Sequence, residues 1–262
     1  MSTIPTILIT GASRGLGAAA ARIAAQLGAA VILNARSAAD LEKVAAAINR
    51  EGGTAVPLPG DVSDTAVVPQ LINQAIEQFG RLDALVNNAG MIEPITAIAN
   101  ANTAVIAQNL AVNLLGPMAL TQAALPHLRQ SQGRVINVSS GAAVNAVPGW
   151  AAYCAAKAGL NHVTRVLAEE EPQVTAVTLR PGIINTEMQA TIRREGAGGM
   201  PPSAYAKYLQ YHAQGHLLPP EKPARALAIL ALYALPEWSG SFLSWNDTQV
   251  QAMIQLRLAA NG

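Results

Sequence analysis

The sequence predicts a single α/β domain in which a parallel sheet is covered by helices on both faces. Short apolar runs alternate with longer segments of helical periodicity from one end of the chain to the other. Hydrophobic residues make up 51% of the 262 residues, enough to bury a sheet on both sides. No internal repeat, linker or low-complexity run divides the chain, so residues 1–262 are expected to form one domain.

The first half of the chain is expected to alternate strands with helices. Gly28 and Gly80 follow two of the helical segments, where glycine is favoured because it readily adopts the left-handed conformation. Strands are expected at residues 6–10, 30–35, 54–58 and 82–87, and helices at 18–27, 37–50 and 65–79.

The second half continues the alternation, with one exception. Residues 182–220 are rich in glycine, proline and polar residues and predict an irregular connection. A connection of that length is typical of an active-site lid, and a disordered surface insertion is the alternative. Strands are expected at residues 134–139, 174–179 and 241–245, and helices at 102–130 (bent at Gly116-Pro117), 151–171 and 223–235.

Successive strand–helix–strand units require right-handed crossovers, which make neighbouring strands parallel. The expected result is a doubly wound, Rossmann-type domain.

The composition narrows the classes of partner. Charged residues are 13% of the chain and the formal net charge is +1, which argues against nucleic acid or an anionic membrane surface. Cys154 is the one cysteine, so no disulfide can form within the chain. There is no basic segment before an apolar run at the N-terminus, and no apolar segment is expected to reach membrane-spanning length. A cytoplasmic protein is therefore expected. The histidines show no metal-ligand spacing, so no metal is expected.

A glycine-rich turn follows the first expected strand. Gly11, Gly15 and Gly17 stand between that strand and a helix, where missing side chains let backbone approach a dinucleotide. The N–H groups at the start of the helix would face the pyrophosphate. Glycine in such a turn can also serve packing alone, but its place between strand and helix favours cofactor binding. The other residues expected in this part of the site are Ser13, Arg14 and Leu16.

The end of the second strand indicates which nucleotide is bound. An acidic residue there would accept hydrogen bonds from a ribose 2′-hydroxyl, but this chain has Asn34-Ala35-Arg36-Ser37. Arg36, with Arg14, could attract a 2′-phosphate. Either arginine could instead be a solvated surface charge. Two basic residues without a competing acid favour NADP(H).

Tyr153 and Lys157 form a pair that could act in proton transfer. They are one helical turn apart, so their side chains share a face, and a nearby ammonium group is expected to lower the pKa of the phenol. An ordinary exposed helix could carry the same pair. Two further signals accompany it: Ser140 stands thirteen positions before Tyr153, and Asn87-Asn88-Ala89-Gly90 follows the fourth strand.

This ordered set of motifs resembles the short-chain dehydrogenase/reductase superfamily, from Ile7 to about Asp247. The resemblance implies four catalytic residues. Tyr153 would donate a proton to the developing alkoxide, and Ser140 would polarise the carbonyl. Lys157 would lower the tyrosine pKa and bind the nicotinamide ribose. Asn113 would hold a water that connects Lys157 to solvent.

Two of these assignments have a neighbouring alternative. Ser139 adjoins Ser140, but the family spacing to the tyrosine selects Ser140, and strand alternation would point Ser139 the other way. Asn109 is one turn before Asn113. Asn113 is preferred because Leu114-Leu115-Gly116-Pro117 follows it as in the family.

The resemblance also implies the rest of the cofactor site. Asp61 would accept a hydrogen bond from adenine, or else it caps a turn before Ser63. Thr186 would contact the nicotinamide carboxamide, or else it is a helix N-cap residue. The remaining expected contacts are Val62 beside adenine, Asn88, Ala89 and Gly90 beside the adenine ribose, and Pro181, Gly182 and Ile184 beside nicotinamide.

One subgroup is more similar than the rest. The segments 149–158, 185–189 and 242–247 are similar to those of sepiapterin reductases and benzil (1,2-diketone) reductases. This implies NADPH-dependent reduction of one carbonyl of a vicinal dicarbonyl. Trp150 and Met188 would border the substrate, or else they only pack. Asp247 would anchor the substrate, or else it is a turn residue after the last strand.

Two other functions are compatible with the motifs. The protein could be an NADP-dependent dehydrogenase that oxidises another secondary alcohol. It could also be a nucleotide-binding regulator without catalysis, although such a protein is expected to lack one of the three catalytic residue types. A homodimer or homotetramer is expected, because relatives pair through the helix carrying Asn113 and the helix after Tyr153.

Overall fold

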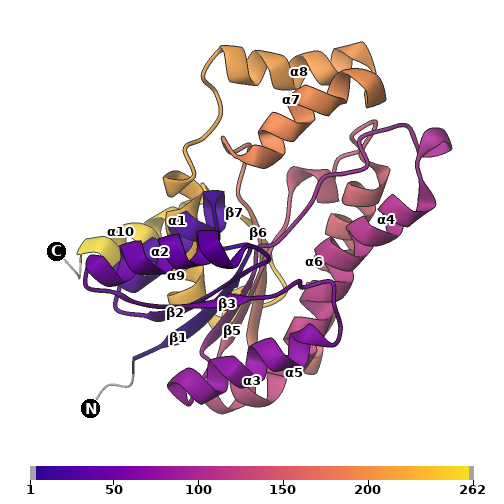
Figure 1. The fold of residues 1–262 in the computed structure, drawn as a ribbon. Helices are drawn as coiled ribbons and strands as arrows, with labels where there is room; N and C mark the ends of the chain where they lie inside the picture. Colours follow the sequence, from indigo (N-terminus) through magenta and orange to yellow (C-terminus); the bar gives the residue numbers. More distant parts are fainter. Residues whose placement is uncertain (1–3, 260–262) are drawn as a thin grey trace.

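The computed structural model of the chain describes residues 4–259. Its strands form one sheet in the order β3-β2-β1-β4-β5-β6-β7, and every neighbouring pair is parallel (Figure 1). The order reverses between β1 and β4, which is the switch point of a doubly wound sheet. The predicted fold class is confirmed. The strands are β1 (Thr6–Thr10), β2 (Ala30–Ala35), β3 (Thr54–Pro59), β4 (Ala84–Asn87), β5 (Arg134–Val138), β6 (Thr175–Arg180) and β7 (Phe242–Ser244).

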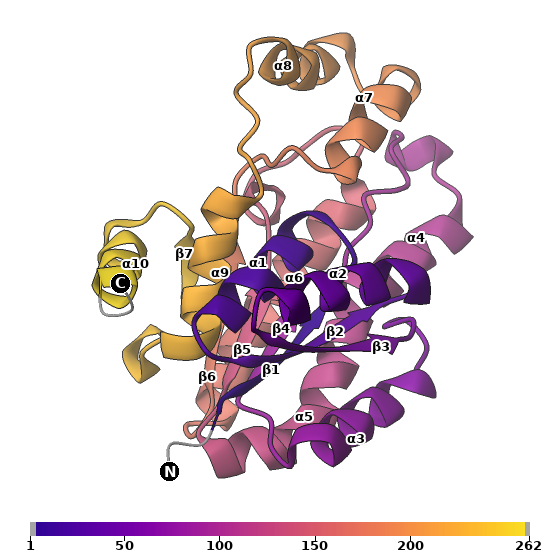
Figure 2. The ribbon, with the colours of Figure 1, turned by 60° about the vertical axis from the view of Figure 1, so that its left-hand side comes forward.

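Helices cover both faces of the sheet (Figure 2). One layer contains α1 (Gly15–Gln26), α2 (Ala38–Arg50), α9 (Glu221–Tyr233) and α10 (Thr248–Ala259). The other contains α3 (Val67–Phe79), α4 (Thr103–Leu110), α5 (Gly116–Ser131) and α6 (Ala151–Glu170). Two further helices, α7 (Glu187–Gly199) and α8 (Pro202–Ala213), stand above the carboxyl end of the sheet (Figure 1). Short 3₁₀ segments occur at Ile98–Asn100, Gly141–Ala143 and Pro236–Trp238.

The strands read as continuous apolar runs because both faces are buried. Along β1, Ile7 and Ile9 pack into the core under α1 and α9, while Leu8 packs into the core under α3 and α5. All three side chains are at most 1% exposed. Successive side chains therefore point to opposite faces of the sheet, but they are apolar on both faces, as expected for a parallel sheet.

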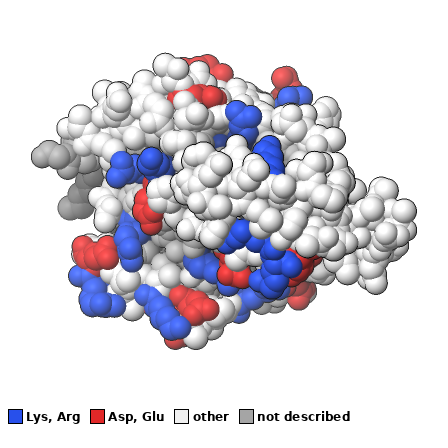
Figure 3. All heavy atoms as spheres, turned by 90° about the horizontal axis from the view of Figure 1, so that it is seen from above, with Lys and Arg blue, Asp and Glu red and all other residues white. Residues whose placement is uncertain are grey.

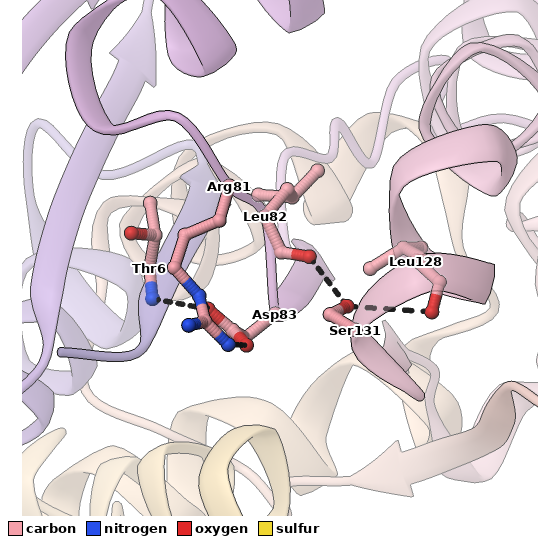
Figure 4. Close-up of polar contacts among 6 residues, drawn as sticks. All are labelled: Thr6, Arg81, Leu82, Asp83, Leu128 and Ser131. Carbon is pink, nitrogen blue, oxygen red and sulfur yellow. Dashed lines mark hydrogen bonds and ion pairs between the residues drawn. The ribbon is translucent and has the colours of Figure 1, made fainter. Parts of the chain in front are cut away.

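The end of the sheet opposite the carboxyl edge is held by polar contacts (Figure 4). The Asp83 carboxylate accepts a hydrogen bond from the Thr6 amide at 2.8 Å and one from Arg81 Nε at 2.8 Å. Ser131 donates to the Leu82 carbonyl at 2.7 Å, which ties the end of α5 to the chain entering β4. These contacts keep β1, β4 and α5 in register.

The helix predicted at 102–130 is present, but its irregularity differs from the predicted bend at Gly116-Pro117. It runs as α4, a π-helical segment (Ala111–Leu115) and α5, so the irregularity lies before Pro117. Pro117 occupies the first turn of α5, a favourable place for a residue without an N–H donor. A π segment inside an α-helix frequently marks a functional site, and this one contains Asn113.

The prediction of an irregular connection at 182–220 was wrong, since the segment contains α7 and α8. The glycines of α7 argued against a helix at the level of sequence, because glycine inside a helix is unfavourable. Two of these glycines are required by close packing: a side chain at Gly196 would meet the Tyr205 ring at 2.6 Å, and one at Gly199 would overlap the Ile95 carbonyl. The C-terminal helix α10 was not predicted.

The continuous helical stretch Thr103–Ser131 is long and apolar enough to pass the length and composition test for a membrane span, with mean hydropathy 1.3. The expectation that no segment would do so is therefore corrected. Only 28% of that apolar window is buried in the chain. A helix that packs against a second subunit has the same character.

Candidate active site

A cavity of about 1430 Å³ opens at the carboxyl end of the sheet. Its walls come from the segments that follow β1 to β6 and from α7 and α8. It spans the switch point between β1 and β4, where doubly wound sheets bind their ligands.

The glycine turn forms a cradle along one wall of this cavity. Gly11 and Gly15 have φ angles of +64° and +56°, which favour glycine. A side chain at Gly17 would meet Asn88 Nδ2 at 2.6 Å, and one at Gly15 would meet Thr186 Cγ2 at 3.2 Å. No side chain of the described residues caps the start of α1, so its first N–H groups are available to an anion. The cradle therefore fits the pyrophosphate of a dinucleotide.

Arg14 and Arg36 are exposed at the rim of the cavity. Burial acts to raise the pKa of the Asp61 carboxyl, but hydrogen bonds from Ser63 and the charge of Arg36 lower it overall. Asp61 Oδ1 accepts from the Ser63 amide at 2.9 Å, so the turn-capping role is present in a residue that also lines the cavity. Sequence reasoning missed Asp40, an acid that lines the same end and pairs with Lys43 at 3.0 Å. Val62 lies beside Asp61 in the wall.

The segment after β4 is tied to the glycine turn. The amides of Asn88 and Ala89 both donate to Thr10 Oγ1 at 3.0 Å, and Asn88 Nδ2 donates to the Thr10 carbonyl at 2.9 Å. Asn88 thus joins the loops that follow β1 and β4. Gly90 and Ala89 line the cavity beside it. Buried Asn87 donates to Asn137 at 2.8 Å and joins β4 to β5.

Tyr153, Ser140 and Lys157 meet in the middle of the cavity wall. Tyr153 and Lys157 share one face of α6 and are 7% and 4% exposed. Tyr153 is hydrogen-bonded to Ser140, and Lys157 Nζ lies 5.7 Å from the centre of the Tyr153 ring. Lys157 Nζ donates to the Val138 carbonyl at 2.8 Å. Ser139 donates to Asn161 at 2.6 Å, so Ser140 is the serine that meets the tyrosine.

Burial dominates the proton affinities of this group. It raises the pKa of Tyr153 to about 12, against the effect of the hydrogen bond with Ser140. It lowers the pKa of Lys157 to about 8. The expected fall of the tyrosine pKa towards neutrality is therefore wrong, because desolvation of the phenolate is the largest effect on that pKa. Tyr153 is therefore a protonated phenol at neutral pH, the form needed to donate a proton.

Asn113 is fully buried and holds the backbone of the segment after β4. Its Nδ2 donates to the Met91 carbonyl at 2.8 Å and to the Asn109 carbonyl at 3.1 Å. It does not itself line the cavity, and its side-chain amide is used in these backbone contacts, while the water-holding role stays a prediction. A side chain at Gly90 would meet Asn113 Oδ1 at 2.9 Å and Lys157 Nζ at 3.9 Å, so Asn113 lies close to Lys157.

Asn109 contributes to the same clamp. Its Nδ2 donates to the Glu93 carbonyl at 2.6 Å, and its side chain is fully buried. The Asn-x-x-x-Asn spacing places Asn109 and Asn113 on one helix face and could have indicated this pair from the sequence.

The segment after β6 lies opposite the glycine turn. Pro181, Gly182, Ile184 and Thr186 all line the cavity, as expected. Ile184 forms a parallel bridge with Leu218, which closes the base of the segment carrying α7 and α8. Thr186 is the N-cap residue of α7, although its side chain bonds the Ile184 carbonyl at 3.4 Å instead of capping the helix. Ser13 and Leu16 line the opposite wall.

The end of the cavity beyond Tyr153 is apolar and aromatic. The Trp150 ring lies 6.0 Å from the Tyr153 ring and 5.0 Å from the Tyr208 ring, measured between centres. Met188 lines this end as predicted, and so do Ile192 and Tyr208. Sequence reasoning missed Ile192 of α7 and Tyr208 of α8, since their position depends on how residues 182–220 fold back over the sheet.

Asp247 lies outside the cavity. Its Oδ2 accepts a hydrogen bond from the Ser244 amide at 2.7 Å, which closes the turn between β7 and α10. The predicted role as a substrate anchor is therefore replaced by the turn-capping role.

The face above the cavity is largely uncharged (Figure 3). Where charged side chains occur on this face, Lys and Arg stand beside Asp and Glu. No group of three or more potential metal ligands occurs among residues 4–259.

A family model described as short chain dehydrogenase matches residues 5–197 of this chain. The chain belongs to the short-chain dehydrogenase/reductase family. Members of this family are oxidoreductases that bind a nicotinamide cofactor, and the glycine cradle and the catalytic group fit one.

Two of the similar proteins are named benzil reductases. A benzil reductase, (S)-benzoin forming, of Saccharomyces cerevisiae is 35% identical over 93% of this chain and 97% of its own. A benzil reductase of Bacillus cereus is 32% identical over 84% of this chain and 91% of its own.

The fold is shared with solved structures, including the following two. A short-chain dehydrogenase/reductase of Saccharomyces cerevisiae has a TM-score of 0.90 at 33% identity, covering 95% of this chain and 99% of its own. An alcohol dehydrogenase of the archaeon Thermococcus sibiricus, complexed with 5-hydroxy-NADP, has a TM-score of 0.78 at 28% identity. The match covers 92% of this chain and 95% of the dehydrogenase.

Proposed function

We propose that this protein is an NADPH-dependent carbonyl reductase acting on one carbonyl of a vicinal dicarbonyl, with a benzil-like or sepiapterin-like substrate. The observation that carries the proposal is the hydrogen-bonded pair of Tyr153 and Ser140, which lies in one cavity with the glycine cradle and an aromatic pocket. The similarity to two benzil reductases supports the dicarbonyl.

Each side chain has a role in this reaction. The bound cofactor supplies the hydride. Ser140 donates a hydrogen bond to the substrate carbonyl, and the neutral phenol of Tyr153 gives its proton to the oxygen as negative charge develops there. Lys157 hydrogen-bonds the cofactor ribose and can return a proton to the tyrosine. The Asn113 clamp on Met91 keeps the wall beside Lys157 in place.

NADP(H) as the cofactor is supported by Arg14 and Arg36 at the rim and by the absence of an acid at 34–37. Reduction is the proposed direction because cells keep NADPH in its reduced form, and the protonated Tyr153 is in the form that such a reduction needs. An NADP-dependent oxidation of another secondary alcohol would use the same residues in reverse.

The protein is proposed to be cytoplasmic and to work as a homodimer or homotetramer. Leu115 of the π segment, Met118 of α5 and Val166 of α6 are large apolar residues that are 56%, 41% and 42% exposed. A face of this kind fits a second copy of the chain.

The test is a substrate panel with consumption of NADPH as readout, containing benzil, isatin, sepiapterin, methylglyoxal and simple ketones. Dicarbonyls should have the highest kcat/KM, and Tyr153→Phe should reduce turnover by ~10²–10⁴-fold while NADPH still binds. Superior activity on simple ketones or sugars would reject the dicarbonyl assignment. Near-normal turnover of Tyr153→Phe would reject the proton donor.

A further inference from the structure

Asp40 places a carboxylate beside the two arginines that are proposed to attract the 2′-phosphate of NADP(H). It follows Arg36 by four residues, in the first turn of α2, and it lines the cavity together with Arg36 and Arg14. Asp61 lines the same end, in the segment that follows β3. The end of the cavity that holds two arginines therefore also holds two acids, so the arginines act against competing negative charge.

Two contacts hold the Asp40 carboxylate in this place. Its Oδ2 accepts a hydrogen bond from Ser37 Oγ at 2.9 Å, and its Oδ1 accepts one from Lys43 Nζ at 3.0 Å. Ser37 adjoins Arg36 in the chain, so the carboxylate is bonded to the direct neighbour of that arginine. Lys43 itself does not line the cavity.

The Asp40 carboxylate is ionised at neutral pH. Hydrogen bonds from Lys43 and Ser37, together with the charges of Lys43 and Arg14, hold the pKa of Asp40 below its ordinary value. Arg14 is thus near enough for its charge to act on this carboxylate. A negative charge that attracts Arg14 also repels a phosphate placed beside the same arginine, and this repulsion is absent for a cofactor with a 2′-hydroxyl.

We propose that Asp40 is a specificity-determining residue whose negative charge opposes the 2′-phosphate and so limits the preference of the site for NADP(H) over NAD(H). The inference rests on the proposed function, because it assigns the phosphate to Arg14 and Arg36. Asp40 also has a role in the fold. Its amide donates to Ser37 Oγ, the N-cap side chain of α2, at 3.4 Å, and an acid in the first turn of a helix is favourable.

The test compares the kcat/KM values for NADPH and NADH in wild type, Asp40→Asn and Glu42→Gln, with the best ketone of the substrate panel at saturation. Asp40→Asn removes the charge and keeps an oxygen that can accept from Ser37. Glu42→Gln removes the same charge from an exposed position of α2 that does not line the cavity, so it is a matched control for net charge.

Asp40→Asn should raise the NADPH/NADH ratio of kcat/KM by roughly two- to fivefold, since interactions between exposed charges are modest, and the gain should appear as a lower KM for NADPH. Glu42→Gln should leave the ratio unchanged. The gain should disappear at roughly 1 M salt, where the Debye length falls to about 3 Å. A gain caused by a rearranged helix cap would persist in salt and would count against the inference.

A double variant tests whether the gain comes from Lys43. Loss of the Asp40 carboxylate frees this lysine, which could then approach the phosphate. Asp40→Asn combined with Lys43→Gln removes both charges and keeps the net charge of wild type, and its ratio should stay above that of wild type. A return to the wild-type ratio would assign the gain to Lys43 and overturn the inference.

The outcomes separate this inference from the proposed function. If wild type prefers NADPH and Asp40→Asn does not raise the ratio, Asp40 does not oppose the phosphate, and the NADP(H) proposal stands. If the ratio rises only because NADH binds more weakly, Asp40 contacts the 2′-hydroxyl instead, and the inference is also overturned. If wild type prefers NADH, the NADP(H) proposal falls, and the inference survives only if the ratio still rises in Asp40→Asn.

Discussion

Burial acts on Tyr153 and Lys157 in the same physical way and moves their pKa values in opposite directions. Water stabilises phenolate and ammonium, so removing water raises the pKa of Tyr153 to about 12 and lowers that of Lys157 to about 8. The tyrosine stays protonated and the lysine holds its proton less tightly. This combination suits a proton donor with a nearby group that can resupply it.

The lysine shift predicts a pH dependence of stability. The unfolded-state pKa of a lysine is near 10.5, above the folded value of about 8. Between these values the unfolded chain binds more protons, so the stability contributed by Lys157 rises with pH across this window. The free energy of unfolding of wild type should therefore increase relative to that of Lys157→Met from pH 7 to pH 9.5. Denaturant unfolding at several pH values measures this, and a constant difference would contradict the shift.

Arg36 determines the choice of nucleotide in our proposal. Arg36→Asp should raise the KM for NADPH and lower the NADPH/NADH preference by about tenfold or more, because a charge-assisted hydrogen bond to a 2′-phosphate is lost. The measurement is kcat/KM with each cofactor. Arg50→Asp, an exposed site at the end of α2 outside the cavity, controls for the change in net charge. An unchanged ratio in Arg36→Asp would leave Arg14 as the candidate.

At the scale of elements, the helices α7 and α8 depend on close approaches that only glycine permits. The end of α7 lies against the segment after β4 at Ile95 and against Gly149. The base of the same segment is joined by the bridge between Ile184 and Leu218. Both ends of the helical pair are thus attached to loops that line the cavity, and the attachment positions Met188, Gln189 and Tyr208 over the substrate end.

Two adjacent glycines at the end of α7 allow a matched test of this attachment. A side chain at Gly199 would overlap the Ile95 carbonyl, whereas one at Gly198 would meet nothing within 4 Å. Gly199→Ala should lower stability by about 1–3 kcal/mol, the usual cost of overpacking, and should reduce kcat/KM for the ketone. Gly198→Ala should be neutral or slightly stabilising. Thermal unfolding and steady-state kinetics measure both, and equal effects at the two sites would show that the contact with Ile95 is unimportant.

At the scale of the whole molecule, the face made by the π segment, α5 and α6 is apolar and exposed. Its large residues Leu115 and Met118 are three positions apart, so they share a helix face. Wild type should sediment as a dimer or tetramer, and Leu115→Arg should shift it towards monomer. Leu209→Arg, at a residue that is 41% exposed on α8, is the control and should leave the mass unchanged. A wild-type monomer at micromolar concentration would contradict the proposed assembly.

The amino-acid sequence alone was sufficient for the doubly wound sheet, the glycine turn and the Tyr153–Lys157 pair. These features are local, because hydrophobic periodicity, turn residues and spacing within one helical turn all depend on residues that are close in sequence. Ser140 was found because a characteristic spacing relates it to the tyrosine. The cavity walls at Gly11, Asn88 and Thr186 followed from the same kind of motif.

Only the tertiary structure decided the rest, because it depends on contacts between distant segments. Residues 182–220 appeared irregular since the glycines of α7 serve packing against Ile95 and Tyr205, which sequence propensity does not include. Asp247 follows the last strand, which is the place where a substrate anchor was expected. Its carboxylate instead accepts a hydrogen bond from the Ser244 amide. The tyrosine pKa rises where a nearby charge predicted a fall, because burial is a property of the folded whole and here outweighs a single neighbour.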